Sequence, residues 1–258
     1  MTLELTRAER AARDLRHHEI IADEYERVVN EPRTLGNNAL FRKVFGLLPK
    51  QRRQMLDIGC GTGQMTLRFG RKFAAVTAVD HSAAMLQIAQ ANLAVEPALG
   101  SRVTCLEQDA FSFASAATTQ FDFICAVGFL HHLSQSDLTE MLRLLKQRLA
   151  VGGRMVFAEP LAFDPADEPK LAQWWNAPFR AQFAGYFKEA EDPDEGPIPL
   201  QLMHQTLAKV GLRLVYERRG WELFPRFGGN VIDRLAIPIL DLFTRKLGVV
   251  GMFVVEAA

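Results

Sequence analysis

The segment that most constrains the fold is Met55–Gly63, in which an apolar run reaches Asp57 and is followed by Gly59, Gly61 and Gly63. This pattern predicts a buried strand, a tight turn and the start of a helix. Because glycine has no Cβ, the turn can adopt positive φ, and a ligand can lie against bare backbone with the first N–H groups of the helix facing it. The segment therefore predicts a nucleotide-sized binding site at the end of a strand.

The spacing of the glycines argues against a phosphate ligand. The dinucleotide fingerprint G-x-G-x-x-G needs its third glycine where this chain has Gln64, and no Gly-Lys-Ser or Gly-Lys-Thr of a phosphate-binding loop follows. We therefore expect a ligand that is not recognised through phosphate.

Further motifs follow at the ends of later apolar runs. Asp80 ends one run, Gln108-Asp109-Ala110 follows the next, and Phe121–Ala126 forms another. Together with Asp-x-Gly-x-Gly-x-Gly, and in this order, they resemble the motifs of the class I S-adenosylmethionine-dependent methyltransferases. A single glycine string has little specificity, whereas four motifs in the order of the family are specific.

The resemblance implies an α/β fold with a Rossmann-like, mostly parallel seven-stranded sheet in the order 3-2-1-4-5-7-6, its last strand antiparallel. The pattern of the chain agrees, because strands that alternate with helices favour a parallel sheet. The expected strands are 54–58, 74–80, 102–107, 121–127, 153–159, 212–216 and 249–255, and the expected helices are 63–70, 82–94 and 135–149.

Segments outside this alternation suggest the domain organisation. Residues 1–50 are expected to form a helical N-terminal cap, and residues 51–258 the methyltransferase domain. Insertions at 161–199, rich in aromatic residues, and at 220–248, with an apolar helix, are expected to lie as two lids over the substrate mouth. The reason is that both leave strands near the carboxyl edge, where open α/β sheets bind ligands. The aromatic residues could equally form a satellite core under a long loop.

The resemblance also implies which residues bind the cofactor, S-adenosyl-L-methionine. Asp80 would bind the ribose hydroxyls, and Asp57 would hold the methionine ammonium indirectly. Tyr25 would fold over the cofactor, although it could equally be a packing residue of an amphipathic helix. The full implied set is Tyr25, Asp57, Gly59, Cys60, Gly61, Gly63, Asp80, His81, Met85, Asp109, Ala110, Phe111 and Ala126.

Methyl transfer from a sulfonium needs donor and acceptor held close together, water excluded and, for some acceptors, a proton removed. His131 and His132, after the fourth strand, are candidate bases because imidazole titrates near neutral pH. In the resembled family a histidine there often only packs beside the cofactor. Glu159 could bind a substrate hydroxyl or ammonium, or form a cap or loop salt bridge. His17 and His18 are predicted to be surface or lid residues, because neighbours on a helix point about 100° apart.

Composition narrows the function classes. The 258 residues carry 30 basic and 30 acidic side chains, so no net positive field would attract nucleic acid. The Asn/Asp-Pro-Pro-Tyr motif of amino-group methylation in nucleic acids is also absent after the fourth strand. The three cysteines lack a metal-ligand spacing, so we expect no metal site. Reduced cysteines and the lack of a signal core or long apolar segment predict a cytoplasmic protein with no transmembrane segment.

The acceptor is the least constrained element of the prediction. The apolar helix expected within 220–248 favours a small hydrophobic or aromatic molecule, methylated on oxygen or nitrogen, but the same helix could form the interface of a homodimer. A second hypothesis is an S-adenosylmethionine-binding protein that uses the pocket for a non-methylating reaction or for regulation. Methylation of a nucleic acid or a protein is a third, weaker one.

Overall fold

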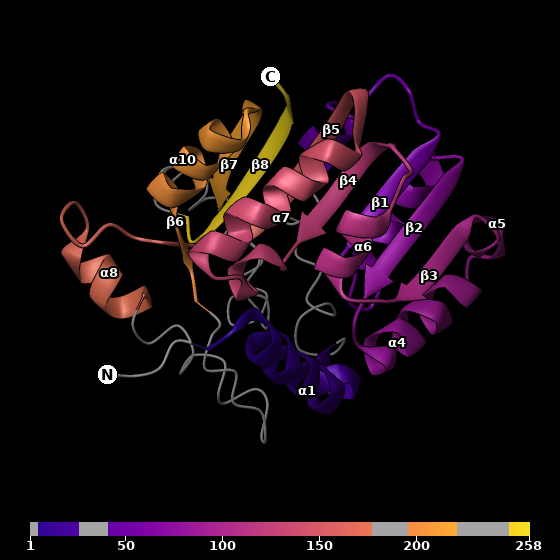
Figure 1. Cartoon of the computed structure of the whole chain (residues 1–258), viewed down its shortest axis with the longest axis horizontal. Coiled ribbons are helices and arrows are strands. Elements are labelled where there is room, and N and C mark those ends of the chain that lie inside the picture. Colours follow the sequence, from indigo (N-terminus) through magenta and orange to yellow (C-terminus); the bar gives the residue numbers. More distant parts are fainter. Residues whose placement is uncertain (1–4, 26–40, 177–195, 221–247) are drawn as a thin grey trace, which may run out of the picture.

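The computed structural model describes residues 5–25, 41–176, 196–220 and 248–258. A twisted sheet forms the centre, and helices cover both of its faces (Figure 1). The first helix, α1 (Arg7–Tyr25), lies apart from these layers, below the ends toward which the parallel strands point. Among the described residues, no helix is long and apolar enough to span a membrane.

The sheet has the order β3-β2-β1-β4-β5-β8-β7, which confirms the expected order 3-2-1-4-5-7-6. Strands β1 to β5 run parallel, and β8 is antiparallel to both β5 and β7. A two-residue strand, β6, pairs with the end of β5 outside this path and makes the sheet eight-stranded. The strands are β1 (Gln54–Ile58), β2 (Ala75–Asp80), β3 (Val103–Glu107), β4 (Phe121–Val127), β5 (Leu149–Ala162), β6 (Ile198–Pro199), β7 (Leu212–Gly220) and β8 (Val250–Ala257).

The helices begin and end where local chemistry favours it. Ser82, Asp109 and Ser134 each accept a hydrogen bond from a backbone N–H of the helix that they precede, and Gly211 ends α10 in the left-handed conformation at φ 71°. The helices are α3 (Gln64–Phe69), η2 (Gly70–Lys72), α4 (Ala83–Ala94), α5 (Pro97–Gly100), α6 (Ala110–Ala116), η3 (Leu130–His132), α7 (Gln135–Arg148), α8 (Pro169–Trp175) and α10 (Leu200–Val210). Residues 41–45 are also helical.

Two hydrophobic clusters, one on each face, hold the sheet between the helices. On one face, α6, α7 and α10 pack against β4, β5 and β8 around buried residues such as Leu142 and Phe157. On the other face, the helix at 41–45 and α3 pack against the sheet, and the ring of Phe69 contacts those of Phe41 and Phe123. Burial of such side chains stabilises the fold by roughly 1.5–3 kcal/mol each.

Several expected elements differ in extent. Strand β5 begins at Leu149 and not at 153, because the chain turns directly from α7 into pairing with Phe121, through a register irregularity. Helix α6 was not expected, and β7 continues to Gly220 along the whole length of β8. Of the two expected insertions, 161–199 contains α8 and β6, while 177–195 and 221–247 lie outside the described residues. The division into a cap and a domain with two lids remains a prediction.

Candidate functional site

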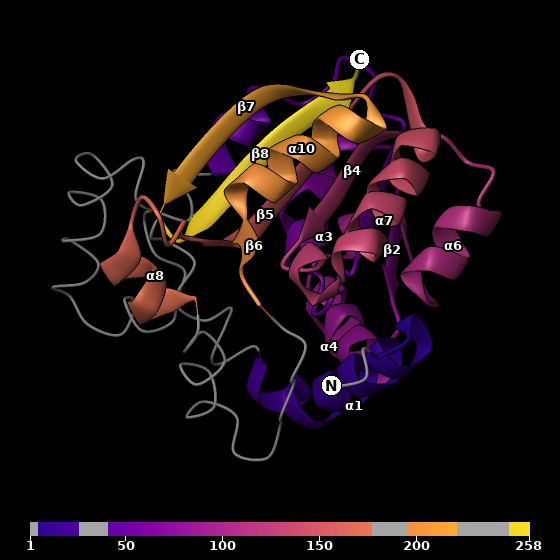
Figure 2. The same ribbon diagram turned by 60° about the vertical axis from the view of Figure 1, so that its left-hand side comes forward.

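Helix α1 is fixed at both ends across the carboxyl edge of the sheet (Figure 2). Near its beginning, Arg7 and Arg10 pair with Asp137 in the first turn of α7, at 2.6 and 2.8 Å. Near its end, Glu19 accepts a hydrogen bond of 2.7 Å from the Ser82 hydroxyl and one of 3.3 Å from the N–H of Ala84. The helix therefore bridges the first turns of α7 and α4 and covers the edge where ligands bind in open α/β sheets.

The glycine turn after β1 has the conformation that the sequence predicted. Gly59, Gly61 and Gly63 have φ of 64°, 50° and 81°. A Cβ at Gly59 would lie 2.7 Å from the Phe129 ring, whereas in the described part of the chain no atom lies within 4 Å of a Cβ at Gly61. Gly59 is thus constrained by packing against the loop after β4, and Gly61 faces open space into which a ligand could fit.

Two acidic residues flank this turn. Asp80, at the end of β2, accepts hydrogen bonds from the N–H groups of Gly61 at 2.7 Å and Ser82 at 2.9 Å. Asp57, in β1, is 1% exposed and accepts a hydrogen bond of 2.6 Å from the Thr66 hydroxyl. Burial raises the pKa of Asp57 to about 7, and the nearby Asp80 adds to the shift against the opposing effect of Thr66. The site therefore contains one carboxylate fixed by backbone donors and one carboxyl group that titrates near neutrality.

The other residues of the expected cofactor set line the same edge. Asp109 caps α6 by accepting from the N–H of Ser112 at 2.8 Å, and the Arg7 guanidinium lies 4.0 Å from the centre of the Phe111 ring. Met85 is buried against Ile21 and Ala22 of α1, with Tyr25 packed on the same group. The remaining members are the buried Cys60 and Ala126, Ala110 at the start of α6, and His81 directly after β2.

Glu159 and His131 form a hydrogen-bonded pair. Glu159 is 0% exposed, and its carboxylate lies 2.8 Å from Nδ1 of His131. It also accepts hydrogen bonds from the N–H groups of Phe129, Leu130 and His131, at 3.2, 3.0 and 3.4 Å. These contacts are those of a loop cap and a salt bridge, so the carboxylate orients the imidazole and does not present an open face to a substrate.

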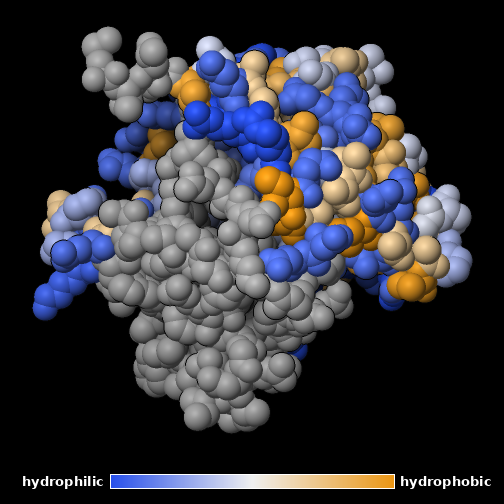
Figure 3. All heavy atoms as spheres, turned by 90° about the horizontal axis from the view of Figure 1, so that it is seen from below, coloured by the Kyte–Doolittle hydropathy of each residue, from blue (hydrophilic) through white to orange (hydrophobic). Residues whose placement is uncertain are grey.

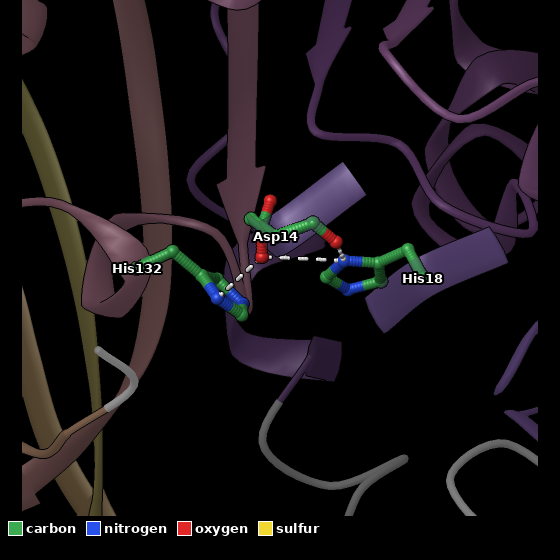
Figure 4. Close-up of side chains that lie close together, drawn as sticks. All are labelled: Asp14, His18 and His132. Atoms are coloured by element: carbon green, nitrogen blue, oxygen red, sulfur yellow. Dashed lines mark hydrogen bonds and ion pairs between the residues drawn. The ribbon is translucent and has the colours of Figure 1, made fainter. Parts of the chain in front are cut away.

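His132, the other expected base, belongs to a separate group of side chains around Asp14 of α1 (Figure 4). Asp14 lies 2.9 Å from Nδ1 of His132, 3.2 Å from Nδ1 of His18 and 3.1 Å from Nε2 of His81. Although burial opposes its ionisation, the neighbouring histidines lower the pKa of Asp14. Burial acts against protonation of His18 and His81, but Asp14 raises the pKa of both.

Sequence reasoning missed the contribution of α1 to this site. His17 and His18 were predicted to be surface or lid residues. The surface location is wrong, because His17 is only 9% exposed and His18 lies in the Asp14 group. Asp14 and Glu19 were not singled out at all, and His18 was given no role in the site. A signal existed in the four-residue spacing of Asp14 and His18, which places both on one face of a helix.

The view from the side of α1 shows that polar and apolar side chains are interspersed over the described part of this face (Figure 3). Ile20 is the large apolar side chain of α1 with the greatest exposure among the described residues, at 55%. The outer surface of α1 therefore does not form a continuous apolar patch in the described part of the chain.

Comparison with known proteins agrees with this geometry. Residues 55–153 match a family model described as a methyltransferase domain. The mitochondrial ubiquinone biosynthesis O-methyltransferase of Schizosaccharomyces pombe is 29% identical over 106 residues, which cover 41% of this chain and 37% of that protein. The magnesium-protoporphyrin O-methyltransferase of Rhodobacter capsulatus is 31% identical over 122 residues, or 47% of this chain and 50% of that protein. The chain thus spans half or less of the length of these relatives.

A solved structure extends the comparison to the whole fold. The magnesium protoporphyrin IX methyltransferase of Synechocystis PCC 6803, crystallised with bound SAH, superposes with a TM-score of 0.62, covering 96% of this chain and 100% of that one at 14% identity. At this identity the likeness concerns the fold alone. Residues 55–153 thus form a methyltransferase domain, and the glycine turn and the order of the sheet are those of the class I S-adenosylmethionine-dependent methyltransferase fold.

Proposed function

We propose that the protein transfers a methyl group from S-adenosyl-L-methionine to an oxygen or nitrogen of a small hydrophobic or aromatic acceptor. The observation that carries the proposal is the contact between the glycine turn and the loop after β4, where Phe129 packs on Gly59 and His131 is held by Glu159. A cofactor site and an oriented proton acceptor are thereby brought to the same edge of the sheet.

The residues around the turn fit the cofactor. Gly61 leaves room for a ligand against the backbone, and each oxygen of the Asp80 carboxylate can accept a further hydrogen bond, from a ribose hydroxyl. Asp57 would hold the methionine ammonium indirectly, and the Phe111 ring would flank the adenine. The cofactor would supply an electrophilic methyl group. The similar Synechocystis enzyme was crystallised with SAH, the product of such a transfer.

Proton removal is assigned to His131. Because Nδ1 contacts the Glu159 carboxylate, the ring is fixed in one orientation, and Nε2 is the nitrogen that would receive a proton from the acceptor. The negative charge of Glu159 also stabilises the imidazolium that forms. His132 is the rival base, with Asp14 in the corresponding position.

The class of acceptor is supported by the relatives. The names of two of the sequence relatives refer to ubiquinone biosynthesis and to magnesium-protoporphyrin, and both proteins are O-methyltransferases. We therefore favour an apolar acceptor that is methylated on oxygen. The apolar helix expected within 220–248 lies outside the described residues, so its predicted role in lining the pocket, like the alternative homodimer and the cytoplasmic location, stays a prediction.

The test is a turnover screen with methyl-labelled S-adenosylmethionine and two matched sets of acceptors. One set contains apolar phenols and apolar carboxylic acids, and the other contains polar metabolites. We expect SAH to form with members of the apolar set, and the His131→Ala variant to lose turnover while it retains cofactor binding in calorimetry. Cofactor binding without SAH formation from any acceptor would favour the non-methylating alternative. Turnover of polar acceptors alone would refute the acceptor class, and size-exclusion light scattering of the same sample tests the homodimer.

A further inference from the structure

We propose that Asp14, His18 and His132 form a binding site for a divalent transition-metal ion, with zinc the best match, which links α1 to the loop after β4. The three residues come from two elements that are distant in the sequence, and they converge beneath α1 (Figure 4). One ring nitrogen of each histidine and one carboxylate oxygen of Asp14 lie within 4.8 Å of one another.

The distances suit a common ion. Ligands of a tetrahedral zinc ion at about 2.0–2.1 Å lie roughly 3.3 Å from each other. Here one oxygen of Asp14 is 2.9 Å from Nδ1 of His132 and 3.2 Å from Nδ1 of His18. The ring nitrogens of the two histidines lie within 4.8 Å of each other, so we expect rotation of the side chains to bring all three ligand atoms to bonding distance of a single ion.

The orientation of the Asp14 carboxylate and the imidazoles beside it favours coordination of a metal ion over a simple ion pair. Among the described residues, Oδ1 of Asp14 is buried and accepts no well-directed hydrogen bond, although two imidazole nitrogens lie beside it. A hydrogen bond requires a donor proton that points at the oxygen, whereas ligands of one ion direct their lone pairs at a common point. Nδ1 of His18 also lies 2.9 Å from the main-chain oxygen of Asp14, a contact that metal binding would exchange for coordination.

The donor set selects the type of metal. Two imidazoles and one carboxylate suit zinc and its neighbours in the first transition row, whereas calcium and magnesium prefer oxygen ligands. Nε2 of His81 contacts the second oxygen of Asp14 at 3.1 Å, so His81 would orient the carboxylate from outside the coordination sphere. A fourth position remains for water or for a polar group of a ligand.

A metal ion in this site would hold α1 in place against the loop after β4, at the carboxyl edge of the sheet. Asp14 and His18 lie in α1, and His132 lies in η3, directly after the proposed base His131. A bound ion would therefore fix the helix that covers the sheet edge to the loop that carries the base. It would also occupy a ring nitrogen of His132 and leave His131 as the base.

The test uses the full chain, freed of metal by a chelator and titrated with ZnCl₂ in a calorimeter. We expect one ion per chain, and a loss of affinity of about 100-fold or more in His18→Ala, which removes a ligand, and in Asp14→Asn, which replaces the charged carboxylate ligand with a neutral amide. His81→Ala, which removes only an orienting contact, should lose about 10-fold. The matched control is His204→Ala, since His204 forms a pair with Glu217 at 2.7 Å but has no second histidine beside that carboxylate; its zinc affinity should equal that of the wild type.

A second measurement keeps the proposal testable if a variant does not fold. Substitution of Co²⁺ for zinc in the wild-type protein should give the intense visible absorption of a tetrahedral site, and circular dichroism shows which variants remain folded. Zinc affinity of the wild type no higher than that of folded His18→Ala, or the absence of tetrahedral Co²⁺ bands, would overturn the proposal. Both readouts are independent of methyl transfer, so they stand even if the proposed function fails.

Discussion

Replacing Glu159 should destabilise the protein more than any surface carboxylate, and the size of the effect can be worked out from its contacts. In Glu159→Ala, the buried N–H groups of Phe129, Leu130 and His131 lose their acceptor, and so does the ring of His131. A buried donor left without a partner costs about 1–3 kcal/mol. Counting the bond of 3.4 Å as weak, we expect a loss of about 3–5 kcal/mol in the free energy of unfolding.

The conservative variant separates charge from shape. Glu159→Gln keeps one oxygen that can accept hydrogen bonds from the loop. Its NH₂ group, however, faces the donors that were bound by the second carboxylate oxygen, so we expect a loss of about 2–3 kcal/mol in the free energy of unfolding. Urea denaturation followed by circular dichroism measures both values. Since about 1 kcal/mol shifts the melting temperature by roughly 2–4 °C in a domain of this size, Glu159→Ala should melt about 6–20 °C lower.

The control is Glu140→Gln on α7, whose carboxylate makes an exposed pair with Arg143 at 2.7 Å. Exposed pairs of this kind contribute about 0–1 kcal/mol. If Glu159→Ala unfolds within about 0.5 kcal/mol of this control, a typical effect of a surface substitution, then Glu159 does not hold the loop, and the orientation of His131 needs another explanation.

Three further predictions concern the glycine turn and its acids. Asp80→Ala should weaken S-adenosylmethionine binding about 30- to 1000-fold, through the loss of two charge-assisted hydrogen bonds worth roughly 2–4 kcal/mol; undiminished binding in calorimetry would exclude the ribose contact. Gly61→Val should abolish cofactor binding and keep a near-native circular dichroism spectrum, because the added branches fill open space and oppose a φ of 50°; a retained titration would contradict this. For Asp57, the folded pKa of about 7 exceeds the unfolded value, so the folded state binds more protons and loses stability as pH rises from about 4 to 7. Asp57→Asn should flatten this part of the curve in denaturation series at several pH values, and equal slopes for variant and wild type would refute the shift.

The agreement between sequence and structure follows the strength of the local signal. Strands β1 and β4 begin and end at the expected residues, because each is an apolar run bounded by polar residues or glycine. The order of the sheet came with the resemblance to the family. Helix α6 was missed because its apolar residues, Phe111 and Phe113, alternate as in a strand, although Asp109 provides a cap. Strand β7 was predicted too short, because Arg218 and Arg219 are uncommon in strands but are accommodated at the sheet edge.

The candidate site was predictable only in part, for a physical reason. The glycine turn and the acid that ends β2 are defined by short-range spacing, so the sequence contains them. The group around Asp14 needs α1, the residue after β2 and the loop after β4 to meet in space, and no local pattern specifies that meeting. Likewise, the sequence places Glu159 at the end of a strand. Whether its carboxylate binds a substrate or the loop after β4 depends on where the N–H groups of that loop point.

The anchoring of α1 has a consequence for how the chain is synthesised. Arg7 binds Asp137 across 130 positions of sequence, and Glu19 binds Ser82 across 63. Most of the stability of a helix in a protein comes from tertiary packing, and α1 has a polar composition. During synthesis, α1 must therefore wait without its docking partners until the chain through α7 has emerged and the central strands have paired. During translation α1 would become ordered later than segments that follow it in the sequence, such as β1 and β2, and a protease added to stalled nascent chains should cut it until residue 137 is exposed.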